Sequence, residues 1–510
     1  MSILTGLEPE RVFHYFEEIA AIPHGSGNTR QISDYLASFA KSRKLDYVQD
    51  DMGNVLIRKP GSAGKEGASP VILQGHMDMV CVKDGDCTLD PEKEGLKLVV
   101  KKRKELPRLS GAPEDLIVTA EGTTLGADDG IAVAFMLTIL EDDSLVHPPL
   151  ECVFTVDEEI GMLGASGLDK SLLRGTMLLN LDSEEEGHLV AGCAGGSEVV
   201  VNLPVDRGTR KVDIYTDRMI ADIRITGLNG GHSGNDIHKG KANANVLLGR
   251  FLQGLMMDHN RQIRIVSVEG GTKDNAIPTD SRILVSCDEE DMDHIRGMAE
   301  NENDVYLSEY RAQDPGIRIT VDFIPESEYE TANRTEVIPL TESSARKLVR
   351  LLYTLPAGVQ NMNPDIPEMV QTSLNLGILR TEDNAVKATF LVRSNVNAER
   401  KELVDRLERI AGEQGGTLQV VSEYAAWEFR PDSQLTGVIR ECYREQYNEE
   451  ILVETIHAGL ECGQFIEGKP ELDAVSFGPE LYDIHSTAEA MDVASVERTW
   501  KLLLSVLGRL

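Results

Sequence analysis

Apolar and polar positions alternate along the chain with two different periods. Apolar side chains fall at helical spacing in residues 9–22 and again after Thr29. Short apolar runs favour buried strands at residues 54–57, 71–80, 150–156 and 176–181, and an apolar helix is expected to start near Gly130. Strands that alternate with helices predict an open, mostly parallel α/β sheet, whose sites cluster at the carboxyl ends of its strands.

Ionisable residues follow these strands. His76 and Asp78 lie in VILQGHMDMV and would share one face if that strand continued, because strand side chains alternate with a period of two. Glu158 and Glu159 follow the strand at 150–156, and Asp182 follows the next. A hydrogen-bonded His–Asp pair or a solvated acidic loop would explain each stretch alone. The recurrence at three strand ends indicates a site, since neighbouring carboxylates repel one another unless something positive lies among them.

Two further segments add candidate ligands. Asp128 and Asp129 come at the predicted start of a helix, where acidic residues also serve as caps. His485 lies in a loop of the sequence SFGPELYDIHSTAEAMDV. Two imidazoles and three carboxylates suit zinc, with manganese or cobalt as alternatives; the set is His76, Asp128, Glu159, Asp182 and His485. One shared carboxylate, with an imidazole and a carboxylate on each ion, is the donor set of a two-metal hydrolytic site.

The pattern changes from about residue 198 and changes back after Trp427. Two stretches read as β-α-β-β-α-β, and the first strand of the second stretch is placed at residues 335–338. We therefore expect a catalytic domain of residues 1–197 and 428–510, with an inserted α+β lid domain of two similar units at 198–427. The basic stretch at 96–108 predicts a surface hairpin.

Composition excludes several classes of partner. The chain has 510 residues, 51 basic and 85 acidic, and a formal net charge of -34. This balance argues against nucleic acid and anionic membrane surfaces, which attract basic patches. The seven scattered cysteines favour a reducing compartment. Neither a signal peptide nor an apolar run long enough to cross a bilayer is recognisable, so a cytoplasmic protein is expected.

Motifs along nearly the whole chain resemble the aminoacylase/carnosinase-type metallopeptidases. Within them the chain is most similar to the aminoacyl-histidine dipeptidases, also called cytosolic non-specific dipeptidases. The motifs are FEEIAAIPHGSGNT, QGHMDMV, GTTLGADDGIAVA, DEEIGMLGA, NLDSEEEG, GGHSGNDIHKGKANAN, TSLNLG, HAGLECG and IHSTAEAMDV. Three positions depart from the family pattern: Asp129 replaces a common Asn, Lys241 an Arg, and Thr487 a Pro.

The resemblance implies a role for each matched residue. His76 and Asp182 would hold one divalent ion, Glu159 and His485 the other, and Asp128 would bridge the two. Asp78 would steady the His76 ring. Glu158 would be the general base for a metal-activated water, and His232 would donate to the oxyanion. Four positions with substrate-side roles are Asn275, Arg393, Gly459 and Glu461.

The expected activity is the hydrolysis of dipeptides, both Xaa-His and a broader range. Two bound metal ions would activate the attacking water, and zinc is the metal expected first. One alternative is a related aminoacylase or an exopeptidase for longer peptides. Another is a non-catalytic metal-binding scaffold, against which the presence of Glu158 beside all five ligands argues. The oligomeric state stays open, a homodimer included.

Overall fold

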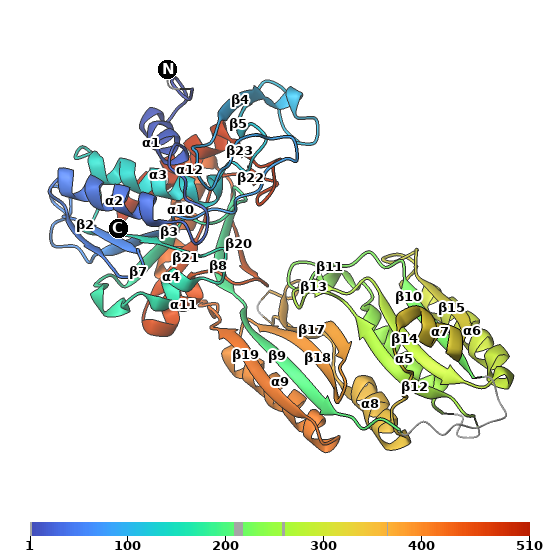
Figure 1. Cartoon of the computed structure of the whole chain (residues 1–510). Helices are drawn as coiled ribbons and strands as arrows, with labels where there is room; N and C mark the ends of the chain where they lie inside the picture. The colour runs from blue at the N-terminus through green and yellow to red at the C-terminus, as the bar shows by residue number, and fades with distance from the viewer. Residues whose placement is uncertain (1–2, 209–217, 258–260, 365) are drawn as a thin grey trace. The chain divides into compact units, whose positions relative to one another are not determined.

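The structure, a computed structural model, describes residues 3–208, 218–257, 261–364 and 366–510 (Figure 1). It divides into two compact units. Unit 1 comprises Met1–Cys193, Trp427–Thr455 and Leu460–Leu510, and unit 2 comprises Ala194–Ala426 and Ile456–Gly459. The sequence-based division into 1–197, 198–427 and 428–510 omits the piece Ile456–Gly459, because so short a segment carries no change of composition.

The main sheet of unit 1 has the strand order β1-β2-β6-β3-β7-β21-β8-β20. The strands are β1 (Asp46–Gln49), β2 (Val55–Lys59), β3 (Val71–His76), β6 (Leu150–Thr155), β7 (Met177–Asn180), β8 (His188–Cys193), β20 (Leu452–Ile456) and β21 (Asp473–Ser476). Strands β6, β3, β7 and β21 run parallel, as predicted. Strands β1, β2 and β8 pair antiparallel, so the sheet is mixed rather than mostly parallel.

Helices surround this sheet, and α3 packs directly on β3. They are α1 (Glu10–Ala20), α2 (Arg30–Ser42), α3 (Ala127–Glu141), α4 (Leu163–Gly167), α10 (Gln434–Tyr447), α11 (Cys462–Gly468) and α12 (Val493–Arg509). Gly75 permits the close approach of α3, because a Cβ there would meet the Asp129 carboxylate and lie 2.7 Å from the Ala132 Cβ. The helix is apolar on every side, since α1 packs on it in turn.

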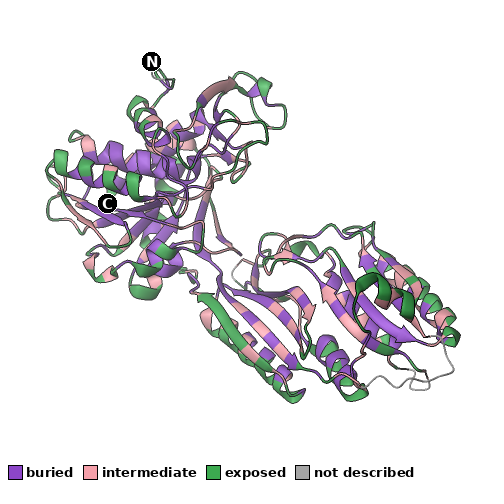
Figure 2. Ribbon diagram, viewed as in Figure 1, coloured by how far each residue is buried: buried purple, intermediate pink, exposed green. Residues whose placement is uncertain are grey.

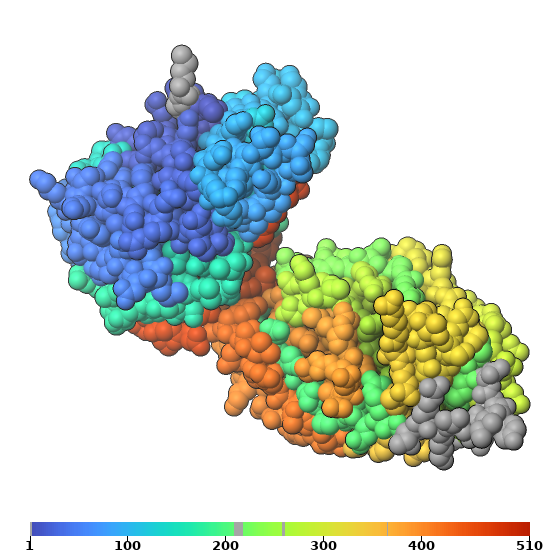
Figure 3. All heavy atoms as spheres, viewed as in Figure 1, coloured from blue at the N-terminus to red at the C-terminus, as the bar shows by residue number. Residues whose placement is uncertain are grey.

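A second, four-stranded sheet of unit 1 has the order β22-β23-β5-β4. Its strands are β4 (Leu98–Lys102), β5 (Leu116–Ala120), β22 (Leu481–Tyr482) and β23 (Ala490–Asp492). The predicted hairpin within 96–108 is wrong, because Leu98–Lys102 is one strand that pairs with Leu116–Ala120. In Figure 3 this light-blue segment lies beside the dark-blue N-terminal residues on the visible face of unit 1.

Unit 2 contains a nine-stranded sheet ordered β15-β10-β14-β12-β17-β18-β9-β19, with β16 paired to β17. Its strands are β9 (Gly195–Pro204), β10 (Met219–Thr226), β12 (Arg264–Gly270), β14 (Ser281–Cys287), β15 (Arg318–Pro325), β16 (Gly358–Met362), β17 (Val370–Thr381), β18 (Ala385–Ser394) and β19 (Thr417–Tyr424), and β11 (Gly231–His232) pairs with β13 (Ala276–Ile277) outside it. Buried and partly exposed positions alternate along β9, as in a sheet covered on one face (Figure 2).

The two halves of this sheet repeat one topology. The first half runs β10, α5 (Ala244–Leu255), β12, β14, α6 (Met292–Tyr310), β15, and its strands lie in the order fourth-first-third-second. The second half shows the same order if β9 is its first strand, followed by α8 (Glu342–Thr354), β17, β18, α9 (Asn397–Glu413) and β19. A short helix, α7 (Glu326–Asn333), follows β15.

The repeat corrects one prediction. The opening strand of the second half is β9, and residues 335–338 form no strand. The first half is thus inserted between the first strand of the second half and its first helix. A prediction that expects the elements of one unit to follow one another along the chain cannot identify such a strand.

Within the ranges that the structure describes, no helix combines the length and the apolar character that crossing a membrane requires.

Candidate metal centre

The carboxyl ends of β3, β6 and β7 lie at one edge of the parallel part of the sheet and carry the predicted ligands. His76 is the last residue of β3, Glu158 and Glu159 follow β6, and Asp182 follows β7. Three overlapping sets of donor atoms lie within 4.8 Å of one another: His76, Asp128 and Asp182; His76, Glu158 and Glu159; and Asp128, Glu159 and His485. All five predicted ligands therefore meet in unit 1.

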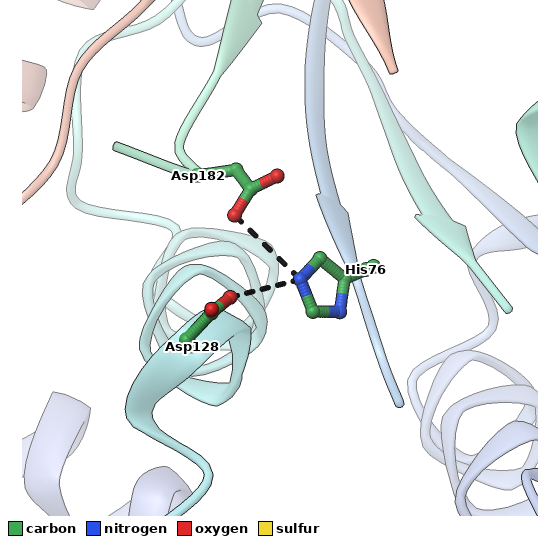
Figure 4. A group of neighbouring side chains, drawn as sticks. All are labelled: His76, Asp128 and Asp182. Atoms are coloured by element: carbon green, nitrogen blue, oxygen red, sulfur yellow. Dashed lines mark hydrogen bonds and ion pairs between the residues drawn. The ribbon is translucent and has the colours of Figure 1, made fainter. Parts of the chain in front are cut away.

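His76 offers one ring nitrogen to this cluster. Its Nδ1 lies 2.9 Å from the Asp78 carbonyl oxygen, which can only accept, so the neutral ring keeps its hydrogen on Nδ1. Its Nε2 then presents a lone pair, at 3.0 Å from Asp128 Oδ1 and 3.6 Å from Asp182 Oδ1 (Figure 4). The side chain of His76 is only 1 % exposed.

The two oxygens of Asp128 face different imidazoles. Oδ1 faces His76, and Oδ2 lies 3.1 Å from His485 Nε2. Glu159 Oε1 lies 2.8 Å from the same His485 nitrogen. One carboxylate shared between two histidines, each with a further carboxylate beside it, is the arrangement that a pair of bridged ions requires.

Asp78 contacts the His76 ring through both its carbonyl and its carboxylate. Strand β3 ends at His76, so Asp78 lies in the following loop and its carboxylate is 3.5 Å from His76 Nδ1. That carboxylate accepts hydrogen bonds from the Glu158 N–H at 3.0 Å and from Ser26 Oγ at 2.8 Å. Asp78 therefore holds the turn that carries Glu158 as well as supporting His76 through its backbone.

The crowding of carboxylates and imidazoles shifts the pKa values of several residues in the cluster. Burial, reinforced by Asp128 and Glu159 against the opposing effect of His76, raises the pKa of Asp182 to about 6. Burial and the carboxylates Asp182 and Glu461 also raise the pKa of Glu158 well above its usual range. Hydrogen bonds to Asp128 and Glu159 raise the pKa of His485 to about 11. Buried carboxylates this close to one another favour a positively charged partner among them.

Three acidic residues at this edge were missed or left unassigned by the sequence analysis. Burial, then Asp128 and Asp182, raises the pKa of Glu184 to about 8. Asp129 accepts the His76 N–H at 3.2 Å. Glu489 is buried against the start of α3. The acidic run DSEEEG and the spacing of Glu489 from His485 were available signals, but acidic runs are usually solvated.

The predicted oxyanion donor, His232, and the four predicted substrate residues fall in two groups. His232, Asn275, Arg393 and Gly459 belong to unit 2. Glu461 belongs to unit 1, where its Oε2 accepts from Thr155 Oγ1 at 2.6 Å and from the Gln74 amide, while Oε1 has no partner in the described chain. Glu461 is therefore placed with the acidic cluster, and burial raises its pKa to about 7.

His232 is held in one tautomer. Its Nδ1 accepts the N–H groups of Gly234 at 3.2 Å and Asn235 at 3.1 Å, so the ring hydrogen is on Nε2. Burial, followed by the charge of Arg393, lowers the pKa of His232. Asn275 lies beside it, because its carbonyl accepts the Ser233 N–H at 2.8 Å. The ring is thus a neutral donor at Nε2.

Arg393 carries a buried charge. It is 5 % exposed, its Nη1 donates to the Tyr424 hydroxyl at 2.9 Å, and its Nε has no hydrogen-bond partner among the described residues. No ion pair joins it to a carboxylate in that part of the chain. A buried guanidinium without a carboxylate favours an anionic ligand.

Known proteins with similar sequences and structures support this picture. The model of the family described as Peptidase family M20/M25/M40 matches residues 116–509. The cytosol non-specific dipeptidase of Escherichia coli (strain K12) is 34 % identical over 507 residues, 99 % of each chain. The crystal structure of aminoacylhistidine dipeptidase from Vibrio alginolyticus matches with a TM-score of 0.88 and 32 % identity, over 99 % of this chain and 98 % of that chain.

A more distant structure, aminopeptidase PepT from Bacillus cereus, shares the fold, with a TM-score of 0.53 and 16 % identity over 98 % of each chain. The match to the family model covers most of the chain, and the similarity to the Escherichia coli enzyme extends over nearly all of it. The chain therefore belongs to peptidase family M20/M25/M40, a family of metal-dependent hydrolases.

Proposed function

We propose that this protein is a two-metal dipeptidase. The observation that carries the proposal is the placement of Asp128, whose Oδ1 lies 3.0 Å from His76 Nε2 and whose Oδ2 lies 3.1 Å from His485 Nε2. His76 and Asp182 are proposed to hold one ion, Glu159 and His485 the other, with Asp128 shared. Nitrogen and oxygen donors suit zinc first, and manganese or cobalt as alternatives.

Bound ions of this kind polarise a peptide carbonyl and lower the pKa of water. Glu158 is proposed to act as general base and to return the proton to the leaving amine. Its burial beside other carboxylates supports this, because a raised pKa matches a residue that must both take and give a proton near neutral pH. Asp78 is proposed to position Glu158 through the hydrogen bond to its N–H.

Unit 2 is proposed to serve as the lid and to supply the polar groups that read the substrate. His232 Nε2–H is suited to donate to the oxyanion, since the tautomer is set by two backbone donors to Nδ1. Arg393 is suited to bind the carboxylate of the dipeptide. Asn275, Gly459 and Glu461 are proposed as further substrate contacts.

The relatives' names and the composition guide the choice of substrate and compartment. Two relatives of high coverage are named as a cytosol non-specific dipeptidase and an aminoacylhistidine dipeptidase. We therefore propose Xaa-His and other dipeptides as substrates and the cytoplasm as compartment, with no nucleic-acid or membrane partner. A homodimer is compatible with this function.

Metal removal and a substrate panel test the proposal. Exhaustive chelation should abolish hydrolysis of dipeptides, and zinc, manganese or cobalt should restore it. The panel should contain a dipeptide, its C-terminal amide, an N-acetyl amino acid and a tetrapeptide. Fastest cleavage of the free dipeptide is expected. Preference for the acetylated compound or the tetrapeptide would favour an aminoacylase or an exopeptidase instead. Full activity in metal-free protein would exclude the two-metal mechanism.

A further inference from the structure

A buried carboxylate outside the predicted ligand set connects the loop of Asp128 to the loop of His485. Glu489 is 3 % exposed and lies a few residues after His485 in the sequence. Its Oε2 accepts the N–H groups of Leu125 at 2.7 Å and Gly126 at 3.0 Å. Its Oε1 accepts those of Ala127 at 2.8 Å and Asp128 at 3.4 Å.

These four N–H groups lie in the segment that leads into α3. Leu125 and Gly126 precede the helix, and Asp128 has a non-helical φ of -82° and ψ of 105°. The first N–H groups of a helix have no partner within it, and the residue before α3, Gly126, has no side chain to cap them. A negative charge is favourable there. A Ser or Asp at the cap position would give the same help locally. The cap here comes instead from a residue 361 positions from Asp128.

The other end of the connection is the turn that carries His485. The Glu489 N–H donates to the Ser486 carbonyl at 3.1 Å, and Ser486 Oγ donates to the Asp483 carbonyl at 2.6 Å. His485 has a φ of 58°, a left-handed conformation that is uncommon for residues other than glycine. Its side chain is 45 % exposed, so packing contributes little to its orientation.

We propose that Glu489 is a positioning residue of the metal centre, which fixes the loop of Asp128 and the loop of His485 relative to each other. Through the Asp128 N–H it holds one ligand directly, and through the Ser486 carbonyl it holds the residue that follows the other ligand, His485. The inference rests on the proposed two-ion centre. It predicts that the affinity for the ion held by Glu159, His485 and Asp128 depends on Glu489 most.

Zinc titration of metal-free protein by isothermal calorimetry tests this. In E489Q the amide nitrogen would face backbone donors, and only one oxygen remains to accept. We expect one of the two binding steps, that of the ion of His485, to lose about 10–100-fold in affinity, as changes next to metal ligands typically do, and the other step to change less. E489D keeps the charge on a shorter side chain and should recover part of that loss.

The matched control is E480Q. Glu480 lies in the same C-terminal segment, and its carboxylate accepts the Glu186 N–H at 3.1 Å rather than an N–H of the Asp128 loop. E480Q should bind both ions with wild-type affinity. Each titration is made below the unfolding temperature of the metal-free variant, and E489D serves if E489Q does not fold.

Wild-type affinity in E489Q, or in E489D if only that variant folds, while the wild type binds both ions, would overturn the inference alone. It would show that Glu489 holds the loop of Asp128 without influence on the ions. A wild-type protein that binds none of zinc, manganese and cobalt would overturn the proposed function and this inference with it.

Discussion

Glu158 and Glu159 are adjacent in the chain and are proposed to have different roles. Asp78 accepts the N–H groups of both, at 3.0 Å and 3.4 Å, but Glu159 Oε1 also lies 2.8 Å from His485 Nε2, the proposed second ligand of the same ion. Glu158→Ala should therefore keep both ions and lose about 10²–10⁴-fold in turnover, as loss of a general base does. Glu159→Ala should lose affinity for an ion. Metal analysis and kcat, measured on both variants, check this.

An exposed acidic neighbour, Glu185, provides the control, because Glu185→Ala also removes one negative charge near the cluster. It should retain ions and turnover. If Glu158→Ala loses metal and Glu159→Ala keeps it, the two roles are exchanged.

His232 is expected to act on rate and leave metal binding unchanged. Its Nε2–H is a preformed donor, and removing one oxyanion donor typically costs about 10²–10³-fold in kcat. His232→Ala should bind zinc normally and show that loss in kcat. His238→Ala, an exposed histidine of the same segment, should keep the wild-type rate. Near wild-type turnover of His232→Ala would remove this residue from the mechanism.

For individual residues, the position of ionisable side chains at the ends of predicted strands indicated which of them lie together. His76, Glu158, Glu159 and Asp182 follow parallel strands, and parallel strands end at one edge. Their assignment to ions came from the family resemblance and is tested by the variants above. Glu489 could not be assigned from sequence, because its role depends on four backbone N–H groups in a distant segment.

At the scale of structural elements, the short segment Ile456–Gly459 of unit 2 contains a buried histidine, His457. His457 is 7 % exposed, with Nε2 at 2.7 Å from Ser373 Oγ and Nδ1 at 3.2 Å from Asn395 Oδ1. Burial, followed by the charges of Arg393 and His232, lowers the pKa of His457 to about 3. The unfolded chain has an ordinary imidazole with a pKa of about 6.5. Between these values only the unfolded state binds the proton.

Acid should therefore destabilise unit 2. The free energy of unfolding contributed by His457 falls as pH falls below about 6.5, by up to about 1.4 kcal/mol per pH unit. Between pH 6.5 and 5 the wild type should lose about 2 kcal/mol more than His457→Gln. Urea denaturation at both pH values measures this difference. His294→Gln, at a half-buried position of α6, should keep the wild-type pH dependence, and the same dependence in His457→Gln would contradict the argument.

Element prediction succeeded where the pattern is local and failed where partners are distant. The period of apolar residues located α1 and α2, and the apolar run near Gly130 located α3, within a few residues. Strand β5 and the pairing of β4 were missed, because a basic stretch alone gives no sign of its partner. Strand β9 was missed because the first half of the sheet separates it from the helix and strands that complete its unit.

For the whole molecule, every proposed ligand lies in unit 1. A ligand that binds only folded protein stabilises it by about 4 kcal/mol at 1,000 times its Kd. Zinc added to metal-free protein should therefore slow amide hydrogen exchange in unit 1, most strongly at residues 76–80, 125–130, 157–160 and 483–490. Strands β10 and β14 of unit 2 should change little. Mass spectrometry of peptide fragments resolves the two units.

Asp128→Asn gives the control for that experiment, because it weakens the shared ligand while keeping the size of the side chain. The variant should lose most of the zinc-dependent protection. Equal protection of both units in the wild type would place part of the metal site outside the proposed ligands.

The repeated topology of unit 2 has a consequence for how its two halves differ. They join through β12 and β17, where Glu269 faces Arg380 and Gly270 faces Leu379. In a symmetric pair of identical chains every substitution appears twice. Here the two halves belong to one chain, so each is encoded separately and dilution cannot dissociate them. Each half can therefore specialise: the first carries His232 and the second carries Arg393, and neither has to serve as the other's copy.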